Sequence, residues 1–350
     1  MTKRRSFIKS ATVLGAATLL HQTSWGHEPQ PPTTSKIKPK KLKLGNTIGV
    51  VAPGFAVKPE ALYLTLETLE KMGFNTYHTE RIKGNYGYFS NTDKERAADL
   101  NEMFANPEID AILCARGGYG CTRILDLLDY EAIQNNPKIL IGFSDITALI
   151  NTIYDKTGLV CFHGPVGTTL DDEYSKSYFK KVLMEPMENL PIKNAILKDP
   201  RQYRNSEYYR YTITKGVGQG ELAGGSLSLV TAMIGTPYEI DFTDKLVFLE
   251  DVEEAPYRMD RMLTQLTQVD TLSKAKGIIF GVCKGCDRKR TTENFTLREV
   301  ILDRIAPLGM PAVYGMSFGH IPQNSTLPIG IEATLNAYKK QLRLEETAVR

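Results

Sequence analysis

The feature that most constrains the fold is an alternation of short apolar runs with amphipathic helical segments. Apolar runs that predict strands cover residues 47–52, 74–78, 111–115 and 139–141. Helices are predicted between them at residues 60–72, 92–107 and 123–128, the second opened by a Thr92–Glu95 capping box. Strands that alternate with helices favour an α/β domain with a parallel, doubly wound sheet. Reactive groups in such sheets gather at the carboxyl ends of the strands.

A different pattern begins at residue 216. Glycines become frequent, and strands are then predicted at residues 245–250, 277–282 and 312–314, with a helix at 257–266. Residues 171–215 are polar and aromatic without a clear period. The sequence therefore predicts an N-terminal domain over residues 45–170, a connecting segment over 171–215, and a smaller, β-rich mixed C-terminal domain over 216–340.

The charge of the chain is concentrated at its N-terminus. The formal net charge is +3, but residues 1–26 contain four basic residues and no acid, which leaves the remainder at −1. A near-neutral body gives no reason to expect nucleic acid or a polybasic membrane contact. We therefore expect a small or modest-sized molecule as the partner.

Residues 1–26 are predicted to be a targeting segment. Arg4 and Arg5 precede a mild apolar run over residues 11–20, which is too short to span a bilayer stably. This pattern resembles a twin-arginine export signal and predicts export to the periplasm, cleavage near residues 24–26 and no stable membrane span afterwards. The alternative is a short membrane anchor that stays attached. Residues 27–44, rich in Pro, Thr and Lys, are predicted to be a linker.

The cysteines and the glycine loop predict neither a metal nor a cofactor. The five cysteines are an odd number, which forces no disulfide framework. Cys283 and Cys286 can form a local disulfide or half a zinc site, but Cys114 and Cys121 have the wrong spacing for the other half. Structural or incidental thiols are favoured. Residues 116–120 lack the G-x-G-x-x-G pattern of a dinucleotide site.

The predicted strand 139–141 runs into Gly142-Phe143-Ser144-Asp145. This stretch resembles the nucleophile elbow G-x-S-x-G, with Ile146 in place of the last glycine. Such a turn exposes the serine hydroxyl and directs backbone N–H groups toward whatever the serine attacks. The alternative is an ordinary turn with a serine as helix N-cap.

A nucleophilic serine needs a base and an acid that orients it. Outside the targeting region, His78 is predicted to be structural, whereas His163 and His320 both follow apolar strands in predicted loops. For the acid, Glu250 ends the predicted strand 245–250 and Asp251 follows it. The residues alone leave both choices open.

Several stretches together resemble the LD-carboxypeptidase family of serine peptidases, which includes muramoyltetrapeptide carboxypeptidases and microcin-immunity peptidases. They occur in family order at residues 87–90, 96–100, 116–120, 142–147, 162–165, 249–252, 260–263 and 319–320. This chain departs from the family at Ser226, where Asn is common, and at Gly54, where Ser is common.

The resemblance implies a fold, a site and a reaction. It implies a Rossmann-like N-terminal domain, a C-terminal domain and an active site at their interface. The family triad of Ser, Glu and His falls on Ser144, Glu250 and His320. The implied reaction removes the terminal D-alanine of a murein tetrapeptide without a cofactor, and the protein is expected to be able to form a homodimer.

For that reaction we expect the backbone N–H of Asp145 and that of Gly117 or Gly118 to bind the oxyanion. Arg116 is the candidate that binds the substrate carboxylate, because a guanidinium fork matches a carboxylate; its alternative role is a structural ion pair. Two other functions stay open: a microcin-type hydrolase of a peptidyl-nucleotide conjugate, and a non-catalytic protein that binds wall peptides.

Overall fold

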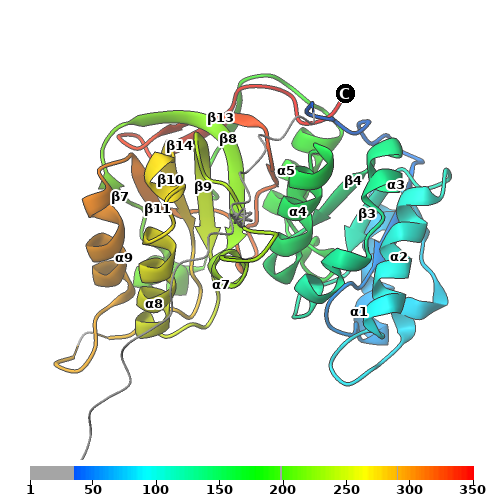
Figure 1. Cartoon of the computed structure of the whole chain (residues 1–350), viewed down its shortest axis with the longest axis horizontal. Coiled ribbons are helices and arrows are strands. Elements are labelled where there is room, and N and C mark those ends of the chain that lie inside the picture. The colour runs from blue at the N-terminus through cyan, green and yellow to red at the C-terminus, as the bar shows by residue number, and fades with distance from the viewer. Residues whose placement is uncertain (1–34, 198, 290) are drawn as a thin grey trace, which may run out of the picture. The chain divides into compact units, whose positions relative to one another are not determined.

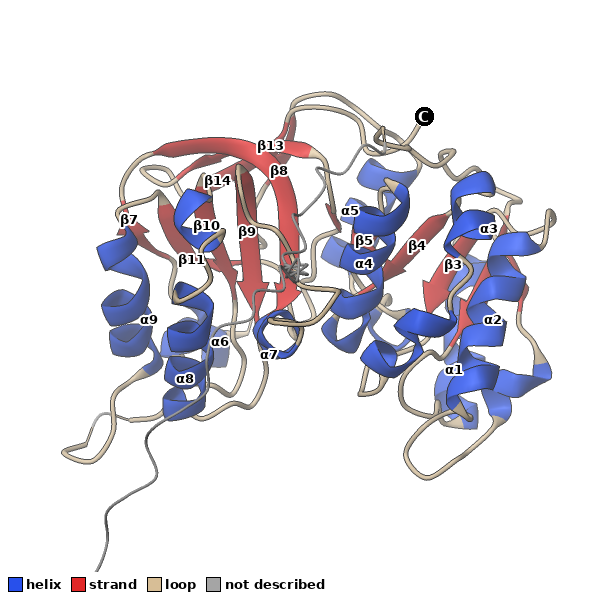
Figure 2. Ribbon diagram, viewed as in Figure 1, coloured by secondary structure: helices blue, strands red, loops and turns tan. Residues whose placement is uncertain are grey.

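The computed structural model describes residues 35–197, 199–289 and 291–350. The predicted export signal and the first part of the predicted linker lie outside these residues. The described chain forms two β-sheets with helices packed beside them (Figures 1 and 2). No helix within these residues is both long enough and apolar enough to cross a membrane.

The first sheet has six strands in the order β12-β5-β4-β3-β1-β2. All neighbouring strands are parallel except β12, which is antiparallel to β5. The strands are β1 (Thr47–Val51), β2 (Asn75–Tyr77), β3 (Ala111–Cys114), β4 (Ile139–Gly142), β5 (Phe162–His163) and β12 (Leu327–Pro328). The connecting helices are α1 (Pro59–Lys71), α2 (Asp93–Ala105), α3 (Tyr130–Asn135) and α4 (Thr147–Thr157). The α/β fold class is thus confirmed.

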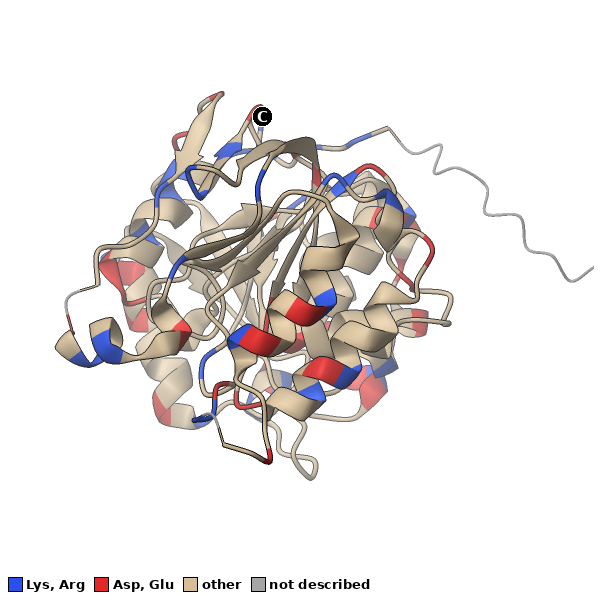
Figure 3. Ribbon diagram, turned by 90° about the vertical axis from the view of Figure 1, so that its left-hand side faces the viewer, with Lys and Arg blue, Asp and Glu red and all other residues tan. Residues whose placement is uncertain are grey.

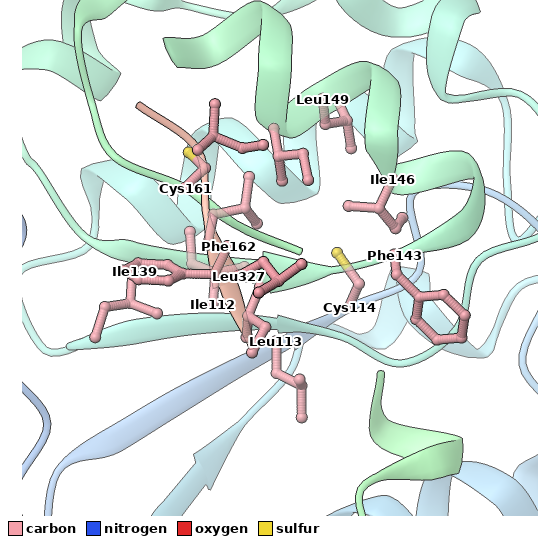
Figure 4. Close-up of a cluster of buried hydrophobic side chains, with 14 of the residues drawn as sticks. Ile112, Leu113, Cys114, Ile139, Phe143, Ile146, Leu149, Cys161, Phe162 and Leu327 are labelled. Carbon is pink, nitrogen blue, oxygen red and sulfur yellow. The ribbon is translucent and has the colours of Figure 1, made fainter. Parts of the chain in front are cut away.

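Local sequence explains these elements. Thr92 caps α2 as predicted: its Oγ1 accepts from the Glu95 N–H at 3.3 Å and donates to Glu95 Oε2 at 2.8 Å. All residues of β3 and β4 are buried, as expected for a parallel sheet covered on both faces. Figure 4 shows Ile112, Leu113, Cys114 and Ile139 of these strands in one apolar cluster with Phe162 and Leu327. The helix predicted at residues 123–128 is a 3₁₀ helix, η2 (Cys121–Leu127).

The second sheet has eight strands in the order β6-β14-β13-β8-β9-β10-β11-β7. Its centre, β8 to β11, is parallel, and antiparallel strands complete both sides. The strands are β6 (Leu190–Ile192), β7 (Tyr211–Thr214), β8 (Val217–Ser226), β9 (Lys245–Glu250), β10 (Gly277–Gly281), β11 (Ala312–Met316), β13 (Glu332–Asn336) and β14 (Gln341–Leu344). Its helices are α7 (Leu227–Ala232), α8 (Pro256–Thr267) and α9 (Leu297–Ile305). Acidic and basic residues are interspersed on the helices in front in Figure 3.

Two segments differ from their predicted roles as connections. Residues 171–215 contain α5 (Glu173–Leu183) and α6 (Pro200–Arg204), and they also supply β6 and β7 to the second sheet. Within the predicted linker, residues 36–42 lie on the folded unit. Leu42 is buried there, and Lys36 and Lys38 pair with Glu346. A buried leucine and two ion pairs thus hold a segment whose composition suggested a linker.

Hydrogen bonds join the helix after Ser144 to the second sheet. Asn151 Nδ2 in α4 donates to the Gly224 carbonyl in β8 at 2.9 Å. The Ser226 N–H, at the end of β8, donates to Thr147 Oγ1 at 3.0 Å. Because β8 pairs with β9, these contacts fix the end of β4 relative to the strand that ends at Glu250.

Candidate active site

Ser144 lies on a strained turn at the end of β4. Its φ of 64° is in the left-handed region, which non-glycine residues rarely adopt. Phe143 before it is extended, and a 3₁₀ turn over Ser144–Ile146 leads into α4. The predicted tight turn from strand to helix is therefore present. It turns the serine out of the strand direction at the carboxyl edge of the sheet.

The glycine loop after β3 lies directly against this serine. A Cβ on Gly117 would lie 2.8 Å from Ser144 Cβ, closer than real side chains approach. Gly118 has a φ of 118°, and a side chain there would collide with the Phe55 ring. The backbone of this loop can therefore approach a group bound at Ser144 only because these positions are glycines.

His320 connects Ser144 to Glu250. Its Nε2 lies 3.0 Å from Ser144 Oγ, and its Nδ1 lies 2.6 Å from Glu250 Oε2. Glu250 is the last residue of β9, and His320 lies in the loop after β11. The structure thus brings the three predicted triad residues into one hydrogen-bonded series, with the serine from the first sheet and its partners from the second.

The charges of Glu250 and His320 favour His320 as a base. Burial disfavours the charged form of Glu250, but the neighbouring His320 outweighs it and lowers the pKa of Glu250. Burial likewise opposes protonation of His320, but the charge and hydrogen bond of Glu250 raise its pKa above the ordinary 6.5. A buried carboxylate that stabilises an imidazolium is the arrangement a serine nucleophile requires.

The other acid and the other histidines that the sequence analysis considered do not join this series. Asp251 Oδ2 accepts from the Ser228 N–H and hydroxyl, both at 2.8 Å. Burial, and then the charge of Glu250, raise the pKa of Asp251 to about 6. His163 was predicted to lie in a loop; it instead belongs to β5 and is fully buried. His78 Nδ1 lies 3.0 Å from the Thr79 carbonyl oxygen.

Two side chains that hold the glycine loop were missed by the sequence analysis. Asp145, predicted only for its backbone N–H, also accepts the Cys121 N–H on Oδ2 at 2.7 Å. Arg96, almost fully buried in α2, donates to the Gly120 carbonyl at 3.1 Å and to that of Pro53. The available signal was an arginine on the apolar face of a predicted helix. Together these side chains fix the loop beside Ser144.

Arg116 begins the same loop and is half-buried. Its Nη1 donates to the Ala56 carbonyl at 3.1 Å, and its guanidinium carbon lies 5.5 Å from the Phe55 ring centre. It makes no ion pair within the described residues, so its alternative role as a structural ion pair finds no support there. Tyr88 and Tyr119 stand nearby, 55% and 46% exposed, with ring centres 5.9 Å apart.

The cysteines take no part in this geometry. All five are buried free thiols. Burial raises the pKa of all five thiols, and it raises that of Cys286 to about 12. Such thiols are inert at neutral pH.

Two family models cover most of the chain. The LD-carboxypeptidase N-terminal domain matches residues 48–164, and the LD-carboxypeptidase C-terminal domain matches residues 219–335. The first match contains the serine, and the second contains Glu250 and His320.

Known proteins resemble the chain over nearly its whole length. It is 38% identical to a probable murein peptide carboxypeptidase of Bacillus subtilis, over 88% of this chain and 94% of that protein. It is 30% identical to the murein tetrapeptide carboxypeptidase of Pseudomonas aeruginosa, over 82% of this chain and 92% of that one. The microcin C7 self-immunity protein MccF of Escherichia coli, solved in complex with aspartyl sulfamoyl adenosine, superposes with a TM-score of 0.76. That match has 25% identity over 90% of this chain and all of the other.

Proposed function

Because this chain belongs to the LD-carboxypeptidase family, we propose that it is a serine carboxypeptidase that removes the terminal D-alanine from murein tetrapeptides. The observation that carries the proposal is the series Ser144–His320–Glu250, with contacts of 3.0 Å and 2.6 Å. The names of the Bacillus and Pseudomonas relatives support the substrate class.

The proposed reaction proceeds through an acyl-enzyme. His320 Nε2 takes the proton of Ser144 as Oγ attacks the carbonyl carbon on the L-configured side of the scissile bond. The tetrahedral intermediate collapses, the C–N bond breaks, and His320 returns the proton to the amine of D-alanine. Water then attacks the ester with His320 again as base, which releases the tripeptide and regenerates the serine.

Backbone N–H groups supply the oxyanion site in this proposal. Those of Asp145 and of Gly117 or Gly118 are the candidates, because the glycine loop lies against Ser144. Losing one such donor costs on the order of 3 kcal/mol of transition-state stabilisation. The hydrogen bonds of Asp145 and Arg96 fix the loop before substrate arrives, so little reorganisation accompanies the reaction.

A carboxypeptidase must also recognise a free carboxylate. Arg116 carries that role in the proposal, since it flanks the glycine loop and has no acidic partner among the described ion pairs. An Arg116→Lys protein should lose most of its preference for the free acid over the amidated tetrapeptide, because an ammonium cannot make the paired contacts of a guanidinium. Unchanged selectivity would remove the carboxylate role.

The test is D-alanine release from free and disaccharide-linked murein tetrapeptide by the full chain and its Ser144→Ala variant. We expect release by the parent and none by the variant, with the exposed Ser273→Ala as matched control. Tripeptide and pentapeptide serve as negative controls, which should not react. If a folded parent releases no D-alanine from either tetrapeptide, the proposed substrate is wrong.

One observation favours a second function, hydrolysis of a peptidyl-nucleotide conjugate. The exposed rings of Tyr88 and Tyr119 stand beside the glycine loop, where they can stack on a base. An aminoacyl sulfamoyl adenosine in the same assay discriminates: cleavage that Tyr88→Ala weakens, without D-alanine release, supports this function. If the parent cleaves neither substrate and a fluorophosphonate leaves Ser144 unlabelled, the chain is a binding protein.

A further inference from the structure

We propose that His163 is a positioning residue for the catalytic acid, joined through one buried water molecule to the second carboxylate oxygen of Glu250. The inference deepens the proposed function and rests on Ser144, His320 and Glu250 acting as a triad. It extends the series by one residue, from the second sheet back into the first.

The imidazole of His163 is completely buried and makes no hydrogen bond within the described residues. The backbone of His163 lies between β4 and β12, opposite Gly142 and Leu327. The rings of Phe248, Phe143 and Phe318 pack against its imidazole edge to face, with centres 5.2 to 5.9 Å away. Neither ring nitrogen has a hydrogen-bond partner within the described residues. A buried polar group left unpaired is destabilising, so packing alone would be served better by phenylalanine.

Glu250 has an unpaired hydrogen-bond acceptor. Its Oε2 binds His320, but its Oε1 is buried without a partner within the described residues. A carboxylate with one oxygen unpaired among apolar side chains is costly. The Glu250 side chain points to the same side of β9 as Phe248, which packs against His163. The unpaired acceptor and the unpaired imidazole therefore occur in the same region.

A bridging water fits the chemistry better than direct contact. The rings of His163 and His320 both pack against Phe143, with centres 5.8 and 4.8 Å from it, and His320 binds Glu250; His163 therefore lies in the neighbourhood of Glu250, yet the two form no direct hydrogen bond within the described residues. A buried water makes about three hydrogen bonds. His163 and Glu250 Oε1 supply two of these bonds.

The electrostatics suit a neutral donor. Burial lowers the pKa of His163 to about 4, although the charge of Glu250 opposes this and that of His320 assists it. These are the ionisable groups that act on His163, one from β9 and one from the loop after β11. A neutral imidazole can therefore donate toward Glu250 without replacing His320 as its charged partner.

Loss of the bridge should affect the chemistry more than the binding. With no donor on Oε1, the negative charge of Glu250 concentrates on Oε2, and His320 holds its proton more tightly. A His163→Phe protein should lose about 10- to 100-fold in kcat with KM unchanged. The acid limb of its kcat/KM profile should move to higher pH.

The experiment uses the full chain with His163→Phe, His163→Gln and, as matched control, His78→Phe. Two rates are measured against pH: D-alanine release, and phosphonylation of Ser144 by a fluorophosphonate, which requires only an activated serine. We expect both rates to fall in His163→Phe, to recover partly in His163→Gln, whose amide can donate to the same water, and to stay parental in His78→Phe. Thermal unfolding reports on folding.

Outcomes separate this inference from the proposed substrate. Parental rates and an unshifted acid limb in a folded His163→Phe protein would overturn the role of His163. If that variant fails to fold, His163→Gln decides: rates below those of the parent with an acid limb moved to higher pH support the bridge, and parental rates with an unshifted acid limb count against it. If the parent is phosphonylated but releases no D-alanine, the proposed substrate fails while the phosphonylation rates still test His163.

Discussion

At the scale of single residues, the candidate site combines one strained backbone conformation with one buried Glu–His pair. Ser144 holds a φ of 64° because β4, the glycine loop and α4 leave its turn no other path. Such strain costs about 1–3 kcal/mol and persists only where surrounding contacts fix it. Glu250, fully buried, can remain charged because His320 is its partner.

The pair predicts a specific dependence on pH. Protonated His320 cannot act as a base, so kcat/KM should fall as the pH falls through a value above 6.5, the side to which Glu250 raises the pKa of His320. Glu250→Gln removes that charge, so the acid limb should move to lower pH while kcat falls by about 10⁴-fold. The kcat/KM profile from pH 5 to 9 tests this; an acid limb at the parental position in the variant would show that Glu250 does not control His320.

The residues show where sequence reasoning reaches its limit. The turn at Ser144 follows from its local sequence and was predicted. Glu250 and Asp251 are adjacent, so they point to opposite faces of the strand end, and the choice depends on which face the rest of the molecule covers. His163 and His320 both follow apolar runs; only the arrival of β12 against β5 buries the first, and that pairing joins residues more than 160 positions apart.

At the scale of elements, the loop after β3 is the part most sensitive to change. Arg96 in α2 and Asp145 in the turn at Ser144 hold the end of this loop through hydrogen bonds to the backbone of Gly120 and Cys121. At Gly117 and Gly118, where the loop approaches Ser144, it presents backbone alone because these residues have no side chains. The loop is thus rigid where it is anchored and open where a substrate carbonyl would lie.

Gly117→Ala should abolish most of the activity. The added methyl group would lie 2.8 Å from Ser144 Cβ, so the loop or the serine must move. We expect kcat to fall by about 10²- to 10³-fold, with about 1–3 kcal/mol lost from the free energy of unfolding. Gly235→Ala is the control, because its surroundings are open but its φ is 77°; it should lose stability and keep kcat. Equal kcat for Gly117→Ala and the parent would exclude a tight approach of the loop during catalysis.

Elements with a strong local signal were predicted well. The capping box of α2 and the apolar runs of β1, β3, β4 and β9 all form where expected. The short strands β6 and β7 were not recognised, because three or four residues such as Leu190–Ile192 carry no readable period. Their pairing partners, β14 and β11, supply the hydrogen bonds that make them strands.

At the scale of the whole molecule, the site is formed by two sheets, and its residues come from segments far apart in the sequence. Ser144 follows β4, Glu250 ends β9 and His320 follows β11. Family membership and the α/β class could be predicted from ordered motifs spread over the chain. The path of residues 36–42 could not, because it depends on Glu346 and Leu159 at distant positions.

The predicted export concerns the whole chain. The Arg4-Arg5 pair predicts the twin-arginine route, which transports folded proteins. In a Gram-negative host, a variant with Arg4→Lys and Arg5→Lys should stay in the cytoplasm, whereas Lys3→Arg with Lys9→Arg should be exported like the parent. Fractionation followed by immunoblotting measures this. Equal periplasmic yield from both variants would exclude a requirement for the arginine pair.

The strand β12 has a consequence for how such a protein can evolve. The two family models divide the chain into halves, yet residues 327–328 lie in the second match and complete the sheet of the first. Recombination that exchanged the second half for that of a relative would also exchange the strand that covers β5 and His163. The halves are therefore not interchangeable modules, and substitutions on either side of this pairing should be inherited together.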